Sequence, residues 1–153
     1  MKILMVCLGN ICRSPLAEGI LAQKCRQKGL DWIIDSAGIG HWNFGSPPDK
    51  RSIEIAKKYG IDISTQQART FHSGDYTAFD RIYAMDATNY NSLMSWALDK
   101  EEESKIQLIM EEVYPGEWMS VPDPYFDDEG FEQVFQMLDM ACDKIIEKYS
   151  VNR

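Results

Sequence analysis

The stretch Cys7-Leu8-Gly9-Asn10-Ile11-Cys12-Arg13-Ser14 comes at the end of an apolar run of strand length, Lys2 to Cys7. A continuous apolar run of this length is typical of a strand that is buried on both faces of a parallel sheet. The residue after the stretch is Pro15, and proline is favoured at the first position of a helix, where its missing N–H would have no partner. The sequence therefore predicts a strand, a tight loop and a helix over Pro15 to Lys28.

The residues of this loop are suited to hold and attack an anion. Backbone N–H groups of a loop that enters a helix N-terminus converge on a negatively charged group. Arg13 adds a planar guanidinium, which can bind a phosphate through two parallel hydrogen bonds. The same positive field favours the thiolate form of Cys7, which is the nucleophilic form of cysteine. A thiolate beneath a bound phosphate is phosphatase chemistry.

Other interpretations of the loop account for fewer of its residues. A buried, inert cysteine at a strand end is common, and Cys7 alone does not exclude it. A nucleotide-binding P-loop needs a Gly-Lys-Ser/Thr sequence, which does not follow. A zinc site needs more ligands than Cys7 and Cys12, and Cys25 and Cys142 fall in helical patterns. The full order of residues favours the anion site.

Length and composition indicate one globular domain over residues 1–153. The 24 acidic residues outnumber the 16 basic ones, and the net charge of −8 argues against a nucleic-acid or membrane partner. No stretch approaches the roughly 20 apolar residues of a membrane span, and the first apolar run is too short for a signal peptide. Four cysteines without a secretion signal lead us to expect reduced thiols in the cytoplasm.

Hydrophobic patterns predict strands that alternate with helices along the rest of the chain. In the final helix, apolar residues recur at steps of three and four. The charge run Asp99 to Glu103 is interpreted as a solvated turn. Such alternation predicts an α/β sandwich with a mostly parallel sheet and the Cys7 loop at its carboxyl edge. The remaining predicted strands are Ile33 to Gly38, Arg81 to Asp86 and Ile106 to Met110, and the remaining helices are Lys50 to Tyr59, Ala87 to Leu98 and Phe131 to Tyr149.

A second candidate site lies in the Pro-, Gly- and acid-rich loop from Tyr114 to Asp128. Its Asp123-Pro124-Tyr125 sequence, taken alone, is a common way to open a turn. Cleavage of a phosphate ester, however, requires a proton for the leaving oxygen. Together with the Cys7 loop, Asp123 therefore becomes the candidate general acid.

These residues together resemble the low-molecular-weight protein tyrosine phosphatase family. The resemblance covers nearly the whole chain and also rests on Ser36-Ala37-Gly38, Trp42-Asn43, Pro47-Pro48-Asp49, Ala68-Arg69 and Asp80 through Asp86. It implies the family's three-layer α/β sandwich, in which helices flank a four-stranded parallel sheet. It also implies hydrolysis of protein phosphotyrosine and small aryl phosphates without a metal or other cofactor.

The resemblance also implies a role for each site residue. Cys7 would form a phosphocysteine intermediate, Arg13 would bind the phosphate, and Asp123 would act as acid in the first step and base in the second. Ser14 would hydrogen-bond the Cys7 sulfur, while Asn10, supported by Ser36, would hold the loop in shape. Cys12 would trap an oxidised Cys7 as a disulfide, and Asp86 would lie near the cleft or cap a helix. The substrate-binding set is Leu8, Gly9, Asn10, Ile11, Cys12 and Ser14 around the phosphate, with Trp42 and Tyr125 beside the substrate's ring.

Three other functions remain to be compared with this one. Arsenate reductases of the same fold need further cysteines beyond the third strand, and none lies between Cys25 and Cys142. Protein arginine phosphatases carry Thr where this chain has Ile11, and an apolar branched side chain favours an aromatic ring over a guanidinium. A non-catalytic phosphate-binding module would lack one of Cys7, Arg13 and Asp123. Tyrosine phosphatase activity is therefore the expected function.

Two departures from the family pattern concern regulation. The stretch Ser64-Thr65-Gln66-Gln67 lacks the His common there in animal members, and Tyr125 is followed by Phe126 rather than a second Tyr. Both argue against control by phosphorylation of paired tyrosines. The expected partner is a phosphotyrosine-containing protein, and because bacterial relatives act on tyrosine kinases of polysaccharide export, such a kinase is one candidate. We expect a monomer or weak dimer.

Overall fold

The computed structural model describes residues 1–150 and contains one sheet of four parallel strands in the order β2-β1-β3-β4. β1 (Lys2–Cys7) pairs with β2 (Ile33–Gly38) on one side and with β3 (Arg81–Ala84) on the other, and β4 (Ile106–Leu108) forms the edge beyond β3. The parallel α/β arrangement with four strands is thus confirmed. Because β1 has a neighbour on each side, the loop that follows it lies at the middle of the sheet's carboxyl edge.

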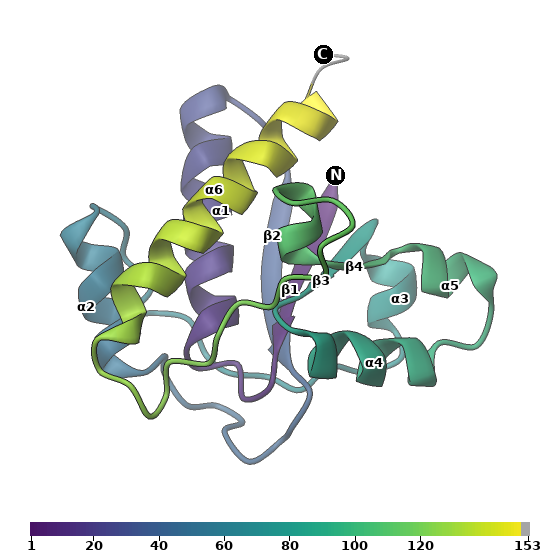
Figure 1. Cartoon of the computed structure of the whole chain (residues 1–153), viewed down its shortest axis with the longest axis horizontal. Coiled ribbons are helices and arrows are strands. Elements are labelled where there is room, and N and C mark those ends of the chain that lie inside the picture. Colours follow the sequence, from purple (N-terminus) through teal and green to yellow (C-terminus); the bar gives the residue numbers. More distant parts are fainter. Residues whose placement is uncertain (151–153) are drawn as a thin grey trace.

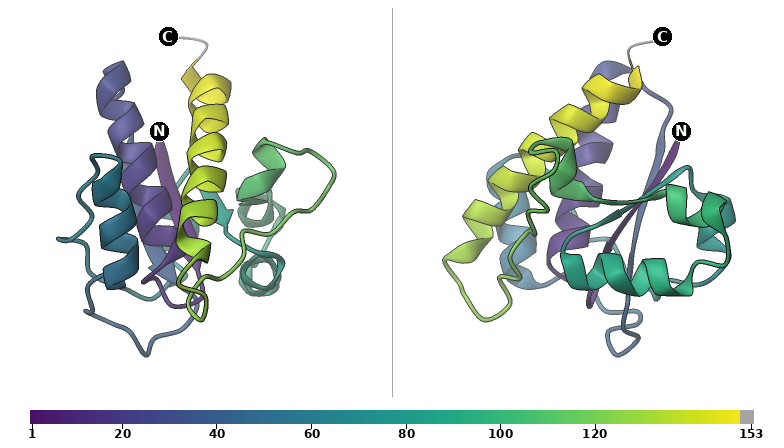
Figure 2. Two further views of the ribbon diagram at one scale, coloured as in Figure 1. Left: turned by 60° about the vertical axis from the view of Figure 1, so that its left-hand side comes forward. Right: turned by 45° about the vertical axis from the view of Figure 1, so that its right-hand side comes forward.

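Helices cover both faces of this sheet and form the two outer layers of the three-layer sandwich (Figure 1, Figure 2). One face is covered by α1 (Arg13–Lys28) and α6 (Gly130–Ser150), with α2 (Lys50–Lys58) packed against both helices. The short α3 (Asp75–Ala78) and α4 (Ala87–Trp96) cover the other face, and α5 (Lys100–Ser104) leads into β4. A 3₁₀ turn, η1 (Ile109–Glu112), follows β4.

Residues of β1 alternate between two separate hydrophobic cores. Ile3, Met5 and Cys7 belong to the core under α1 and α6, whereas Leu4 and Val6 belong to the core under α3 and α4. All five side chains are almost completely buried. This explains the unbroken apolar run in the sequence, since a central parallel strand has no face exposed to water.

Several boundaries differ from those predicted. α1 begins at Arg13, because Cys12 occupies the N-cap and the loop winds directly into the helix. β3 and β4 end two residues early, at Ala84 and Leu108, and α4 also ends two residues early, at Trp96. The prediction of a turn for the charge run Asp99 to Glu103 is wrong in part, since four of its residues belong to α5. The Asp99 carboxylate accepts the Glu102 N–H at 2.8 Å and caps this helix.

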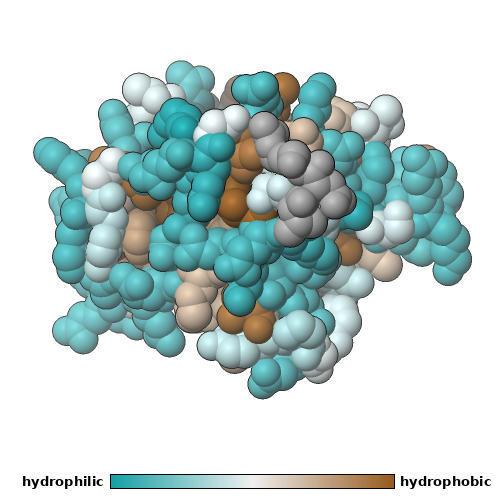
Figure 3. All heavy atoms as spheres, turned by 90° about the horizontal axis from the view of Figure 1, so that it is seen from above, coloured by the Kyte–Doolittle hydropathy of each residue, from teal (hydrophilic) through white to brown (hydrophobic). Residues whose placement is uncertain are grey.

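The end of the molecule at which β1 begins and α6 ends has a mostly hydrophilic surface, with apolar side chains visible only between polar ones (Figure 3). The carboxyl ends of the strands lie at the opposite end of the molecule. Within residues 1–150, no helix has the length and apolar character needed to cross a bilayer.

Replacement of a core residue of α6 tests how firmly this helix holds the sandwich together. Leu138 is fully buried in the core shared with α1, and we expect Leu138→Ala to lower the free energy of unfolding by about 2–5 kcal/mol. Met140 on the same helix is 43% exposed, so Met140→Ala should change the free energy of unfolding by less than about 0.5 kcal/mol. Urea denaturation followed by circular dichroism measures both, and equal losses would contradict the packing described.

Candidate active site

The Cys7 sulfur lies at the carboxyl end of β1 and contacts the first turn of α1. Its Sγ is 2.9 Å from the Ser14 Oγ, and both residues are almost completely buried. The Ser14 Oγ also accepts an N–H of the Asn10 side-chain amide at 2.8 Å. Since the Ser14 oxygen is already an acceptor, its own proton is free to point at the sulfur. The Ser14 hydroxyl is thus placed to donate to the sulfur whenever Cys7 is a thiolate, since a thiolate can only accept.

Asn10 fixes the loop between β1 and α1 in an uncommon backbone conformation. Its φ of 57° lies in the left-handed region, which asparagine tolerates better than most residues. The side-chain amide also donates to Ser36 Oγ at 2.9 Å, and its oxygen accepts the Arg69 backbone N–H at 3.0 Å. At Gly38 a Cβ would come within 3.1 Å of the Leu8 carbonyl oxygen, so the loop and the end of β2 approach closely. The Asn10 side chain thus ties the loop to Ser36 on β2 and to the backbone of Arg69.

Two hydrogen bonds from one nitrogen hold the Arg13 guanidinium in a single orientation. Its Nη1 donates to the Asp86 carboxylate at 2.6 Å and to the Val121 carbonyl at 3.0 Å. Burial opposes the positive charge, but Cys7, Asp86 and Asp123 raise the pKa of Arg13 above its ordinary value. Asp86 also caps α4, where its other oxygen accepts the Asn89 N–H at 2.8 Å. Asp86 is therefore a helix cap, and it does not line the cavity but contacts Arg13, which does.

Asp123 enters the site from the loop before α6. Its carboxylate is 3.7 Å from the Arg13 Nη2, is 46% exposed, and accepts the Tyr125 N–H at 3.1 Å. A cavity of about 240 Å³ lies between this loop and the Cys7 loop. Trp42 and Tyr125 are exposed at this cavity. Its lining residues are Cys7, Leu8, Gly9, Ile11, Cys12, Arg13, Trp42, Asn43, Asp123, Tyr125 and Phe126.

Most of the residues selected from the sequence meet at this cavity. Asn10, Ser14 and Ser36 are buried and hydrogen-bonded to one another behind the loop, and do not line the cavity itself. Two lining residues had no assigned role. Asn43 donates its side-chain N–H to the Gly9 carbonyl at 3.1 Å and so ties the Trp42 loop to the Cys7 loop, and Phe126 is 95% exposed. Their positions next to Trp42 and Tyr125 were the signal that could have identified them.

The four cysteines are free and buried. Cys12 is at the cavity with Cys7, but burial, together with Asp49, Cys7 and Asp123, raises the pKa of Cys12 to about 12 despite the opposing effect of Arg51. Cys12 is therefore a protonated thiol at neutral pH. Among residues 1–150, no group of three or more His, Cys, Asp or Glu side chains is placed to hold a metal ion.

Known proteins of this architecture share both the fold and much of the sequence. A low molecular weight protein-tyrosine-phosphatase of Bacillus subtilis, YfkJ, is 42% identical over 147 residues, which covers 95% of this chain and 93% of the relative. The crystal structure of YfkJ matches with a TM-score of 0.92 at 38% identity, over 100% of this chain and 96% of the other. A Drosophila arginine phosphatase matches with a TM-score of 0.92 at 34% identity, over 100% of both chains.

A tyrosine phosphatase from Entamoeba histolytica matches with a TM-score of 0.91 at 35% identity, over 98% of this chain and 97% of the other. The family model described as low molecular weight phosphotyrosine protein phosphatase matches residues 2–153. With the cavity, its cysteine and its arginine in place, the chain belongs to the low molecular weight phosphotyrosine protein phosphatase family.

Proposed function

We propose that this protein, acting as one domain over residues 1–153, hydrolyses protein phosphotyrosine and small aryl phosphates through a phosphocysteine intermediate. The observation that supports the covalent route best is the contact between the Cys7 Sγ and the Ser14 hydroxyl in a cavity that also holds Arg13 and Asp123. A thiolate, a fixed guanidinium and a partly exposed carboxyl group are the three groups this reaction needs.

In the first step, the Cys7 thiolate attacks the phosphorus atom and forms an S–P bond, while the bond from phosphorus to the phenolic oxygen breaks. Asp123 in its acid form donates its proton to that oxygen, so the leaving group departs as a neutral phenol. Arg13, oriented by Asp86 and the Val121 carbonyl, binds the other phosphate oxygens with the loop N–H groups.

In the second step, water attacks the phosphorus atom and the S–P bond breaks, which releases inorganic phosphate. The Asp123 carboxylate accepts a proton from that water and returns to its acid form. Cys7 leaves as a thiolate, and the proton of the Ser14 hydroxyl stabilises the developing negative charge on the sulfur.

The walls of the cavity favour an aromatic phosphate ester. Trp42 and Tyr125 present two aromatic side chains, and Ile11 presents an apolar one. A planar ring stacks against such walls, whereas a guanidinium would need acceptors for its N–H groups. Phosphoarginine is nevertheless the second candidate, because a structural neighbour is named an arginine phosphatase. The proposed partner is a phosphotyrosine-containing protein, of which a bacterial tyrosine kinase is one candidate.

Peptides that differ only in phosphotyrosine or phosphoarginine distinguish the two candidates. We expect kcat/KM for phosphotyrosine to be higher by about tenfold or more, since a polar group left unpaired at an apolar wall lowers binding. Release of inorganic phosphate measures both reactions. The matched control is Cys7→Ser, which should release none but still bind inorganic phosphate in calorimetry. Turnover by Cys7→Ser, or a preference for phosphoarginine, would contradict the proposal.

The role of Asp123 is tested with a series of aryl phosphates whose leaving groups differ in acidity. We expect Asp123→Ala to lower kcat/KM about 10²–10⁴-fold for phosphotyrosine, the usual range for a general acid. The loss should shrink as the leaving phenol becomes more acidic, because a stable phenolate needs no proton. Asp127→Ala in the same loop is the control, and its kcat/KM should match that of the wild type for every member of the series. An equal loss across the series would assign the acid elsewhere.

We also propose that the site is sensitive to oxidation, with Cys12 as the resolving thiol. Peroxide converts the Cys7 thiolate to a sulfenic acid and is reduced to water. The Cys12 sulfur then forms a disulfide with Cys7 as the sulfenic hydroxyl leaves as water. Because the pKa of Cys12 is raised to about 12, this capture should be slow at neutral pH and faster in alkali. A reducing cytoplasm, the location we expect, would restore both thiols.

Reversibility of inactivation tests this proposal. After treatment with peroxide, dithiothreitol should restore activity in the wild type but only partly in Cys12→Ser, where Cys7 proceeds to irreversible oxidation. Peptide mapping should find Cys7 joined to Cys12. Cys25 and Cys142 should remain reduced, since burial raises the pKa of both. Full recovery in Cys12→Ser would refute the protective role.

A further inference from the structure

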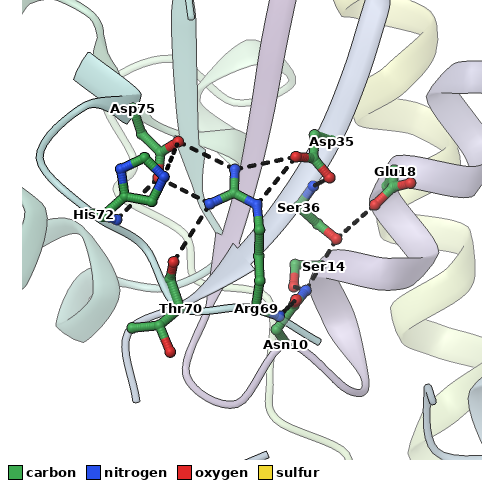
Figure 4. Close-up of polar contacts among 9 residues, drawn as sticks. All are labelled: Asn10, Ser14, Glu18, Asp35, Ser36, Arg69, Thr70, His72 and Asp75. Atoms are coloured by element: carbon green, nitrogen blue, oxygen red, sulfur yellow. Dashed lines mark hydrogen bonds and ion pairs between the residues drawn. The ribbon is translucent and has the colours of Figure 1, made fainter. Parts of the chain in front are cut away.

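A carboxylate that neither step of the reaction uses lies at the end of a hydrogen-bonded chain from the active site. Glu18 is partly buried one turn after Ser14 on α1, and its Oε1 accepts the Ser36 hydroxyl at 2.6 Å (Figure 4). The Ser36 Oγ in turn accepts one N–H of the Asn10 amide at 2.9 Å, and the other N–H of that amide goes to Ser14 Oγ at 2.8 Å. Ser14 contacts Cys7.

The donors along this chain all have a defined direction. The Asn10 NH₂ group can only donate, and its orientation is supported by the Arg69 backbone N–H, which donates to the Asn10 oxygen at 3.0 Å. Both hydroxyl oxygens therefore accept from Asn10, and both hydroxyl protons point away from it. The Ser36 proton points to Glu18. The Ser14 proton points to the Cys7 sulfur when Cys7 is a thiolate, because a thiolate can only accept. Glu18 accepts at one end of the chain as the sulfur does at the other.

The surroundings of Glu18 make its charge state variable. Burial raises the pKa of Glu18, the hydrogen bond from Ser36 lowers it, Asp35 on β2 raises it and Arg69 lowers it, to a net value of about 7. Arg69 compensates this carboxylate only in part, because its guanidinium is within 3.1 Å of both Asp35 and Asp75. These two groups, Asp35 and Arg69, are the charges that act on Glu18 among the described residues.

We propose that Glu18 is a positioning residue of the active site, whose ionised form anchors Ser36 and Asn10 and thereby keeps the Ser14 hydroxyl on the Cys7 sulfur. The inference rests on the proposed function of Cys7. A protonated Glu18 loses the charge-assisted bond to Ser36 and becomes a donor that competes with Asn10 for the Ser36 oxygen. Asn10, at a positive φ, depends on its side-chain bonds to stay in place. Departure of the thiolate should therefore be slower when Glu18 is protonated.

Ionisation of Glu18 should speed the reaction, but it lowers the stability of the folded chain. A pKa raised from 4.5 to about 7 means that the folded chain binds this proton more tightly than the unfolded chain. The contribution of Glu18 to stability therefore falls as the pH rises from about 4.5 to about 7. Glu18→Gln should melt at a higher temperature than the wild type at pH 8 and yet turn over more slowly. A residue with a purely structural role would lose stability and activity together.

The dependence of kcat on pH, measured with a saturating aryl phosphate that has an acidic leaving group, tests the link to catalysis. The wild type should show a rise in kcat with a midpoint near pH 7, where Glu18 ionises. Glu18→Gln should lack this rise. Above pH 7 its kcat should be about five- to tenfold lower than that of the wild type, because a neutral hydrogen-bond acceptor is weaker than a charged one by about this factor. Ser36→Ala, which interrupts the chain with Glu18 intact, should lack it as well.

The matched control is Glu101→Gln, which removes an exposed carboxylate from α5 and should keep the wild-type profile. A rise with the same midpoint in Glu18→Gln or in Ser36→Ala would overturn the inference. Because Ser36→Ala tests the same chain at another residue, the inference remains falsifiable if one variant fails to fold.

A second measurement needs no catalysis. In nuclear magnetic resonance of the whole chain, the side-chain amide protons of Asn10 should shift with the same midpoint as the Glu18 carboxyl carbon, and the Asn10 shift should vanish in Glu18→Gln. Turnover without this shared titration would overturn the inference and leave the proposed function intact. A shared titration in a wild type that releases no phosphate would instead overturn the proposed function.

Discussion

The side-chain amide of Asn10 holds the active-site loop to the rest of the molecule. It bonds Ser14 on α1, Ser36 on β2 and the backbone of Arg69, so three separate segments meet at one carboxamide. These bonds offset the cost of the left-handed conformation at Asn10. Loop N–H groups can converge on a phosphate only while that conformation holds, and the hydroxyl at the Cys7 sulfur depends on the same amide.

Much of the fold was accessible from hydrophobic pattern, because buried parallel strands and an amphipathic last helix leave strong periodic signals. The predicted boundaries are wrong where contacts with the rest of the fold, rather than the local pattern, determine where an element ends. β4 was expected to extend through Met110, but the chain turns into a 3₁₀ helix after Leu108. α3 has four residues, too short for any period to show. The spacing of Asp99 and Glu102 is a capping signal that would have indicated α5.

The candidate site was less evenly predictable. Cys7 and Arg13 share one loop, so their proximity follows from the sequence, and the need for a proton donor linked them to Asp123 before the resemblance to a family was considered. The partners of Arg13 were not accessible in this way. Asp86 satisfies the pattern of a helix cap and an ion pair equally well, and the Val121 carbonyl is a backbone group that carries no side-chain signature. Glu18 carries no signal of its own in the sequence, because its hydrogen-bond partner Ser36 lies on another element.

The separation in sequence of the groups around Arg13 has a consequence for how the protein is made. Its partners Asp86 and Val121 lie 73 and 108 residues further along the chain. Chains emerge from the ribosome amino end first, so β1 and its cysteine exist long before these partners. Contacts between distant segments also form late in folding. The nascent chain therefore carries Arg13 without these partners, and its guanidinium takes its fixed orientation only when nearly the whole molecule has assembled.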